Sequence, residues 1–202
     1  SDPYQPREKV YRYTRASIKI LGDRGWRILI ATKSDLVKED AELLAKYRTG
    51  VSITITTLKK EIARKLEPGA PSPQKRLGAL EELKIPKIVR VDPLIPGIND
   101  DEESIAEVLE AAKSVGVEHV VFSTYKAKSD NLARMANHFP EIKKVYEKGE
   151  RVGNYIYLPF SIRKKILERA SKIAEAFGLS WAFCREGIRF KARTCDGSYL
   201  IK

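Results

Sequence analysis

Short apolar runs that alternate with helix-like segments are the feature that most limits how this chain can fold. Four short runs are mostly apolar or β-branched, as expected for strands buried on both faces. They cover residues 26–32, 51–56, 87–91 and 118–124. Five segments between or before them carry apolar residues at helical spacing. They cover residues 8–21, 36–47, 58–66, 72–83 and 101–115.

Strands that alternate with helices in this way indicate an α/β fold with a parallel sheet, either open or closed into a barrel. The alternation breaks after residue 126. A polar helix near 129–139, a strand-like YIYL at 155–158, a helix at 161–177 and a strand-like SWAFCRE at 180–186 follow. We expect residues 127–202 to form an α+β extension that packs on a barrel formed by residues 1–126.

The chain is strongly basic, with 38 Lys and Arg against 27 Asp and Glu, a formal net charge of +11 and a pI near 9.6. Such a charge attracts polyanions through counterion release, so DNA or another nucleic acid is an expected partner. The basic segments 143–144 and 163–165 lie near Tyr146, Tyr155 and Tyr157, and cations with aromatic rings can hold nucleic acid. Solvated helix faces explain the same residues, and both interpretations stay open.

The composition favours a cytoplasmic protein without a membrane partner. No stretch approaches the ~20 apolar residues needed to cross a bilayer, and the first residues, SDPYQPREK, contain no apolar signal segment. Two cysteines, Cys184 and Cys195, do not make a disulfide framework and fit a reducing compartment. Lys and Glu are abundant, and 32% of the residues are charged. Such a composition is a trend of proteins from heat-adapted (thermophile) sources.

Polar residues follow each predicted strand, where parallel α/β sheets and barrels build their ligand sites. They are 32–35 (TKSD), Ser52, Thr54, Thr56, Thr57, 92–100 (DPLIPGIND) and 123–126 (STYK). Hydroxyls, a cation and backbone-exposing turns suit a polar ligand with carboxylate, amine and ribose groups. Helix capping explains Ser34, Asp35 and Thr57 at least as well, because each lies where a helix would begin.

Five segments carry a resemblance to a known family. They are DPYQPRE (2–8), TKSDLV (32–37), VSITITTL (51–58), ARKLEPGAPSPQKRL (63–77) and DPLIPGINDDE (92–102). In this order and spacing the chain resembles radical S-adenosylmethionine (radical SAM) enzymes of the spore photoproduct lyase-like group, over about residues 2–126. The resemblance implies a partial (βα)6 TIM-like barrel, of which about four βα units are present.

The resemblance also implies two cofactors, S-adenosylmethionine (SAM) and a [4Fe–4S] cluster. Members bind the cluster through three thiolates of a C-x3-C-x2-C motif, and cluster ligation requires thiolates. The 202 residues contain no such motif. We therefore expect the cluster cysteines to lie upstream of Ser1, and the chain by itself to be inactive.

Residues of several segments would hold SAM by this resemblance. They are Asp2, Tyr4, Gln5, Lys33, Ser34, Ser52, Thr54, Arg64, Arg76, Ile95, Pro96 and Gly97. Lys33 would face the SAM carboxylate or the substrate, and the turn at 95–97 would lie beside adenine. Arg64 and Arg76 would clamp the carboxylate with two hydrogen bonds. Pairing with Glu67 is the alternative for both arginines.

Cys184, Cys195 and Tyr125 are the candidate catalytic residues. The two thiols would help to ligate a second metal centre, or one would donate a hydrogen atom to a substrate radical, or both are ordinary buried side chains. Tyr125 and Lys126 follow the last barrel strand and would face the substrate.

We therefore expect a radical SAM enzyme that cleaves SAM reductively, with electrons from a donor protein, and abstracts a hydrogen atom from its substrate. The resemblance suggests lesion repair in DNA. A basic nucleic-acid-binding module without enzyme activity is one alternative, and a SAM-binding barrel without radical chemistry is another.

Overall fold

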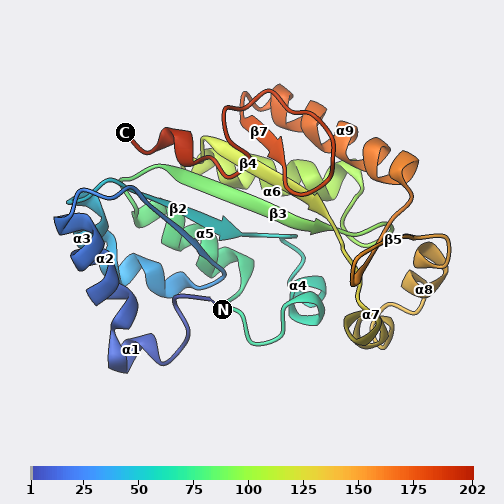
Figure 1. Cartoon of the computed structure of the whole chain (residues 1–202), viewed down its shortest axis with the longest axis horizontal. Coiled ribbons are helices and arrows are strands. Elements are labelled where there is room, and N and C mark those ends of the chain that lie inside the picture. Colours follow the sequence, from blue (N-terminus) through green and yellow to red (C-terminus); the bar gives the residue numbers. More distant parts are fainter. Residues whose placement is uncertain (1) are drawn as a thin grey trace.

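The computed structural model describes residues 2–202, and its centre is a sheet of five parallel strands (Figure 1). The strands lie side by side in chain order: β1 (Ile28–Thr32), β2 (Thr49–Thr54), β3 (Lys87–Leu94), β4 (His119–Thr124) and β7 (Ser180–Phe183). Chain order is the arrangement of a barrel, whereas a doubly wound sheet reverses its order near the middle. Within residues 2–202 β1 and β7 do not pair, so the predicted α/β part-barrel is confirmed as an open sheet.

Helices and short 3-10 turns connect the strands or flank the sheet. They are α1 (Glu8–Tyr11), α2 (Tyr13–Asp23), α3 (Ala41–Ala45), α4 (Lys60–Leu66), α5 (Pro73–Glu82), α6 (Glu102–Ser114), α7 (Ser129–Ala136), α8 (Ile142–Tyr146) and α9 (Phe160–Ala176), with 3-10 turns η1 (Asp35–Asp40) and η2 (Ser198–Leu200). Figure 1 shows α5, α6 and α9 along the same side of the strands. None of the described helices combines the length and the apolar content that a bilayer crossing requires.

Strand residues alternate between a helix-covered face and a second face, here called the inner face. Ser52 pairs in register with Ile88, and Thr54 with Arg90, so these four side chains share the inner face. The residues between them point to the helices and join the apolar core. They are Val51, Ile53, Val89 and Val91. At these central positions of β2 and β3 the polar side chains thus lie on the face that would become the interior of a closed barrel.

The predicted helix over 8–21 is two helices, broken at Arg12, which has a left-handed backbone (φ 52°). The Glu8 carboxylate accepts a hydrogen bond of 2.9 Å from the backbone N–H of Thr14, and so caps the start of α2. Likewise, the predicted helix over 36–47 begins with the 3-10 turn η1. Apolar spacing alone does not reveal either change, because each depends on local hydrogen bonds.

The fifth strand comes from the segment that we expected to form the extension. β7 pairs with β4 in parallel, with His119 opposite Ser180, so the sheet continues across residue 126. The rest of that segment adds a small antiparallel hairpin, β5 (Glu150–Val152) with β6 (Tyr155–Tyr157). Two backbone hydrogen bonds between Ala127 and Ile156, of 2.7 and 2.9 Å, hold the hairpin against the chain that leaves β4.

The C-terminal segment 195–202 crosses the inner face at the amino ends of the strands. Ile201 packs so closely on Gly50, at the start of β2, that a Cβ there would lie 2.9 Å from its side chain. The ring of Tyr199 meets the buried ring of His119 edge-on, with centroids 5.7 Å apart. The segment therefore closes the end of the part-barrel opposite to the strand ends where ligands are expected.

This packing predicts a large penalty for Gly197→Ala. Gly197 has φ +76°, and a Cβ there would lie 2.7 Å from Ile88 and 2.8 Å from the His119 ring. We expect urea unfolding to show a loss of about 3 kcal/mol in the free energy of unfolding. Gly178→Ala is the control, because Gly178 has φ +66° with open space around it, and should lose about 1 kcal/mol. Equal losses would mean that the C-terminal segment does not pack on the inner face.

Candidate cofactor and substrate site

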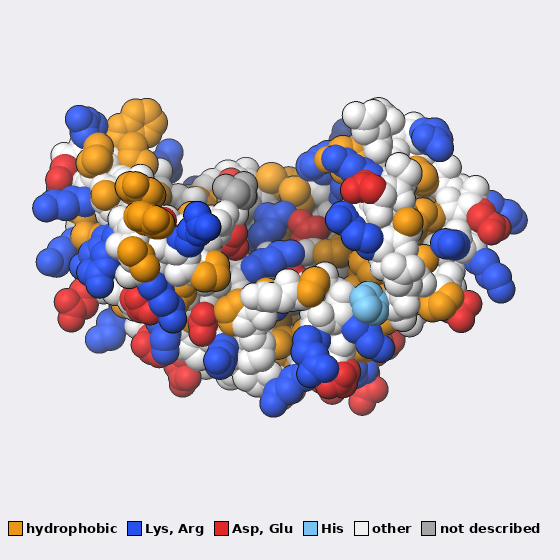
Figure 2. Space-filling model, turned by 90° about the horizontal axis from the view of Figure 1, so that it is seen from below, with side chains coloured by type: hydrophobic (Ala, Val, Ile, Leu, Met, Phe, Trp, Pro, Cys, Tyr) orange, Lys and Arg blue, Asp and Glu red, His pale blue; other side chains and the backbone are white. Residues whose placement is uncertain are grey.

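A cavity of about 490 Å³ opens where the strands end. We call it the strand-end cavity. Its walls are Lys33, Thr54, Leu66, Glu67, Arg90, Asp92, Pro93, Thr124, Tyr125, Lys126, Met135, Tyr155 and Arg185. Most of these residues end or follow β1, β2, β3, β4 and β7, while Leu66, Met135 and Tyr155 come from α4, α7 and β6. Figure 2 shows the molecule hollowed between two raised flanks, with Lys and Arg side chains gathered in the hollow.

The buried carboxylate of Glu67 forms one wall with two cations. Its oxygens lie 3.0 Å from Lys33 Nζ and 2.6 Å from Arg76 Nη1, and the Glu67 side chain is only 4% exposed. Arg76 also donates to the backbone carbonyls of Thr54 (2.6 Å) and Pro71 (2.8 Å), which fixes its guanidinium. Among the described residues neither Glu67 oxygen has a hydrogen bond of good geometry, so the carboxylate retains capacity for a donor from a ligand.

A second ion pair lies at the floor of the cavity, on the inner face of β3. Arg90 Nη2 contacts Asp92 Oδ2 at 2.6 Å. Burial alone would lower the pKa of Arg90, but Asp92 and the neighbouring Cys184 raise that pKa above its ordinary value. The pair therefore presents both a fixed cation and a partly exposed carboxylate to the cavity.

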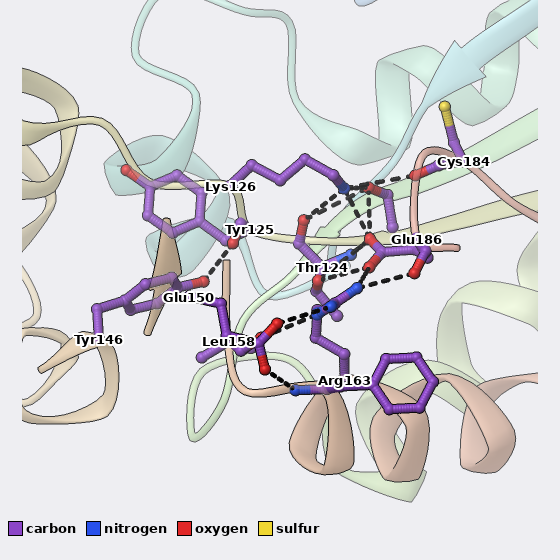
Figure 3. Close-up of polar contacts among 11 residues, drawn as sticks. Thr124, Tyr125, Lys126, Tyr146, Glu150, Leu158, Arg163, Cys184 and Glu186 are labelled. Atoms are coloured by element: carbon purple, nitrogen blue, oxygen red, sulfur yellow. Dashed lines mark hydrogen bonds and ion pairs between the residues drawn. The ribbon is translucent and has the colours of Figure 1, made fainter. Parts of the chain in front are cut away.

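A third carboxylate, Glu186, is completely buried at the opposite wall (Figure 3). It accepts hydrogen bonds from Lys126 Nζ and from the backbone N–H of Thr124, both at 2.7 Å, and from Ser123 Oγ at 3.1 Å. Arg163 of α9 contributes Nη1 at 3.3 Å. Glu186 thereby ties the chain after β7 to the end of β4 and to α9.

Tyr125 lies at the edge of this network. Burial raises the pKa of its phenol to about 12, and its hydroxyl donates a 2.8 Å hydrogen bond to Asn131 Oδ1. The hydroxyl of Tyr146 donates to the Tyr125 backbone carbonyl (Figure 3). Tyr125 is therefore a neutral phenol near pH 7, held in place beside the cavity.

Several of the residues predicted to bind SAM surround a neighbouring cavity of about 320 Å³ instead. They are Asp2, Tyr4, Gln5, Lys33 and Ser34. Lys33 lines both cavities and so connects them. The Asp2 carboxylate accepts hydrogen bonds from Thr32 Oγ1 (2.6 Å) and from the backbone N–H of Lys33 (2.7 Å), which ties the N-terminal segment to the end of β1.

Two of these residues also have structural partners. Ser34 Oγ accepts from the backbone N–H of Leu36, so Ser34 caps η1 as the capping alternative expected. The buried hydroxyl of Tyr4 donates to Asp40 at 2.9 Å. Burial and the Asp40 charge raise the pKa of Tyr4 above its ordinary value.

Thr54 lines the strand-end cavity, whereas Ser52, Arg64 and Arg76 do not. Ser52 lies deeper on the inner face, and its buried Oγ has no partner among residues 2–202. The Arg64 side chain is 80% exposed and pairs with Glu61, whereas Arg76 is 1% exposed and pairs with Glu67. Pairing with Glu67 is thus what the structure shows for Arg76.

The turn at 95–97 follows β3 and lies outside both cavities. Ile95 is fully buried, Pro96 is half-buried and Gly97 is exposed with φ +72°. The Asn99 side chain accepts from the backbone N–H of Ile95 at 2.7 Å and donates to the backbone carbonyl of Thr56 at 2.8 Å. The turn is therefore held rigidly beside the end of β2.

The two thiols are both free, with Cys184 half-buried and Cys195 exposed. The Cys184 thiol points away from the Glu186 network in Figure 3. Burial is the main cause that raises the pKa of the Cys195 thiol. No group of three or more His, Cys, Asp or Glu side chains suited to a metal ion is present within residues 2–202.

Of the residues that line the cavity, Asp92 lies in the predicted strand-end run 92–100, whereas sequence reasoning did not select Arg90, Met135 or Arg185 and considered Tyr155 only for a nucleic-acid surface. Arg90 carried a usable signal, because a cation inside the apolar run KIVRV requires a partner or a ligand. Tyr155 and Arg185 carried none, since they reach the cavity only through the hairpin and through the pairing of β7 with β4.

The residues that line the cavity match the chemical groups of SAM, whereas the described residues do not provide the ligands of a [4Fe–4S] cluster. Cations (Lys33, Arg90) match a carboxylate, and the carboxylates of Glu67 and Asp92 match an amino group and hydroxyls. Apolar walls match a heterocycle, and 490 Å³ is within the usual range for such ligands. A cluster needs thiolates, and two cysteines do not make its ligand set.

The open parallel sheet in chain order, with a charged cavity at its strand ends, defines an α/β part-barrel with a site suited to a polar ligand. A family model, the radical SAM superfamily, matches residues 2–109, which is more than half of the chain. The chain belongs to the radical SAM superfamily. This membership supports SAM as its cofactor and SAM-dependent radical chemistry in general.

Relatives in sequence are longer than this chain. An uncharacterized protein of Methanocaldococcus jannaschii is 36% identical over 111 residues, which cover 53% of the chain and 42% of that protein. An uncharacterized protein of Mycobacterium tuberculosis is 27% identical over 191 residues, which cover 89% and 56%. The chain spans about half the length of the curated relatives that it matches.

Solved structures show the same fold. A domain of pyruvate-formate lyase-activating enzyme from Bacteroides vulgatus matches with a TM-score of 0.62 at 16% identity, over 90% of the chain and 95% of that domain. SuiB of Streptococcus suis bound to S-adenosylmethionine matches with a TM-score of 0.59 at 12% identity, over 94% of the chain and 38% of SuiB. At these identities the likeness concerns the fold alone.

Glu67→Gln tests the wall that holds the cavity in shape. The neutral amide leaves the buried Arg76 guanidinium without a counter-charge, so we expect the free energy of unfolding in urea to fall by about 3 kcal/mol. The matched control is Glu61→Gln, whose carboxylate is 76% exposed and pairs with Arg64, and which should change stability by less than about 0.5 kcal/mol. Similar small effects for both variants would show that the Glu67 pairing does not organise the site.

Proposed function

We propose that these 202 residues form the SAM-binding and substrate-binding part of a radical SAM enzyme. One observation carries this proposal: fixed cations and carboxylates converge on the strand-end cavity of a superfamily member. In this superfamily SAM supplies, on reductive cleavage, a carbon radical that abstracts a hydrogen atom from the substrate. Residues 2–202 do not provide the thiolate set of the cluster, and the electron donor would be a separate protein, so we expect the chain alone to bind SAM without turnover.

Each wall of the cavity has a separate task in this proposal. Lys33 and Arg90 orient the carboxylate of the cofactor, because both cations are fixed by acidic partners. Glu67 and Asp92 accept hydrogen bonds from its amino group or ribose hydroxyls. Leu66, which lines the cavity with Pro93 and Met135, excludes water from the reacting atoms.

The finer assignment is to the spore photoproduct lyase-like group, with a lesion in DNA as the substrate. The segment ARKLEPGAPSPQKRL and the segment DPLIPGINDDE support this group, and a net charge of +11 supports a polyanionic substrate. Cys184 and Tyr125 remain candidates for roles in hydrogen transfer, since both lie near the end of a strand that borders the cavity.

A nucleic-acid-binding module without a cofactor is the second candidate. An exposed cation beside an aromatic ring favours it, as in the contact of Arg185 with the Tyr155 ring at 5.3 Å. Arg163, from the predicted basic segment 163–165, is buried and pairs with Glu186, so it does not contribute to such a surface. Under this alternative the chain binds DNA in a salt-sensitive way and has no affinity for SAM.

Titration calorimetry with SAM separates the two candidates. We expect the chain to bind SAM, and Lys33→Ala to raise the Kd about tenfold, because one charged hydrogen-bond donor is lost. Lys38→Ala is the control, since Lys38 carries the same charge but pairs with the exposed Glu82 at 2.8 Å away from the cavity. Absent SAM affinity, or an equal loss in both variants, would contradict the proposed function.

A further inference from the structure

Two cations lie over one tyrosine ring at the mouth of the strand-end cavity. Lys128 Nζ lies 4.7 Å, and Arg185 Cζ 5.3 Å, from the ring centroid of Tyr155. The two cations come from distant segments, one after β4 and one after β7. The bridge between Ala127 and Ile156 brings them together, because it sets the hairpin and its Tyr155 beside Lys128.

Arg185 is held outward by its neighbours. It has a left-handed backbone, with φ 58°, which non-glycine residues adopt rarely. On one side the backbone N–H of Cys184 pairs with Phe122 in the sheet at 2.9 Å, and on the other the Glu186 carboxylate is buried among its donors. Because both neighbours are anchored, the exposed Arg185 side chain projects from a fixed point.

Among the described residues near the cavity, Lys128 and Arg185 are cations without a carboxylate partner. Lys33, Arg90 and Lys126 each pair with a carboxylate, from Glu67, Asp92 and Glu186 respectively. Neither Arg185 nor Lys128 forms an ion pair within the part of the chain that the structure describes. Their positive charge also lowers the pKa of the Tyr155 phenol, through Lys128 first and then Arg185.

We propose that Lys128, Tyr155 and Arg185 form a clamp for a phosphate group of the substrate at the cavity mouth. A guanidinium offers two parallel donors to phosphate oxygens and an ammonium adds a point charge, which suits a phosphate better than a neutral group. Both cations are already held over the Tyr155 ring, so they need less ordering when the anion binds. The clamp rests on the proposed function, because it supposes that the substrate enters the strand-end cavity.

Fluorescence anisotropy with a labelled single-stranded hexathymidylate tests the clamp in the 202-residue chain. We expect Arg185→Gln and Lys128→Gln each to weaken binding about tenfold at low salt. Each should also reduce the slope of log affinity against log salt concentration by about one. Lys164→Gln is the matched control, because it removes the same charge from an exposed pair with Glu168 and should change the affinity less than about twofold.

Three further outcomes are decisive. Equal losses in Lys164→Gln and in the clamp variants would overturn the clamp in favour of general charge attraction. A poly-glutamate peptide that binds as tightly, and is weakened as much by Arg185→Gln, would overturn the assignment to phosphate. We expect the clamp variants to bind SAM as tightly as the unmodified chain does, and weaker SAM binding in them would overturn the clamp by placing these residues at the cofactor. If the unmodified chain does not bind SAM, the proposed function fails, and the anisotropy measurement still tests the phosphate contacts.

Discussion

Buried carboxylates that each bind two cations organise the polar end of this sheet. Glu67 joins Lys33, after β1, to Arg76 in α5, while Glu186 joins Lys126, after β4, to Arg163 in α9. A lone charge in such a place would be costly, but each of these has counter-charges, and Glu186 also accepts backbone and hydroxyl hydrogen bonds. The two pairings connect loops that are far apart in sequence, and the cavity between them takes its shape from these pairings.

The two faces of the sheet differ in polarity, because buried charges and polar groups need partners. The helix-covered face is mostly apolar, whereas the inner face carries Ser52, Thr54 and Arg90. At the amino ends of the strands the segment 195–202 covers this polar face. At the carboxyl ends nothing in residues 2–202 fills it, which leaves the charged cavity open to a ligand.

Periodicity predicts most of the sheet, because strands buried on both faces are apolar almost without interruption. It predicts β1, β2, β3 and β4 within a few residues, and the resemblance predicts their order. It does not reveal that β7 is the fifth parallel strand, since the pairing with β4 depends on tertiary contacts. The hairpin strand β5 is also absent from the prediction, because its residues are exposed and show no apolar pattern.

Strand-end position predicts candidate site residues better than residue type does. Lys33 and Thr54 reach the cavity as that position suggests, and Arg64, chosen for its guanidinium, lies in solvent paired with Glu61. Neither strand-end position nor residue type selects Arg185, because the left-handed backbone that turns it outward depends on the anchoring of Glu186.

Hydrogen exchange of the chain with and without saturating SAM tests the central claim most directly, because it maps the bound ligand onto the backbone. The account predicts slower exchange at the strand ends that line the cavity, over residues 54–58, 66–70 and 124–127, with no change at 195–202. Slower exchange confined to the segment 195–202, or no change anywhere at saturating SAM, would contradict the claim that the cofactor binds at the strand ends.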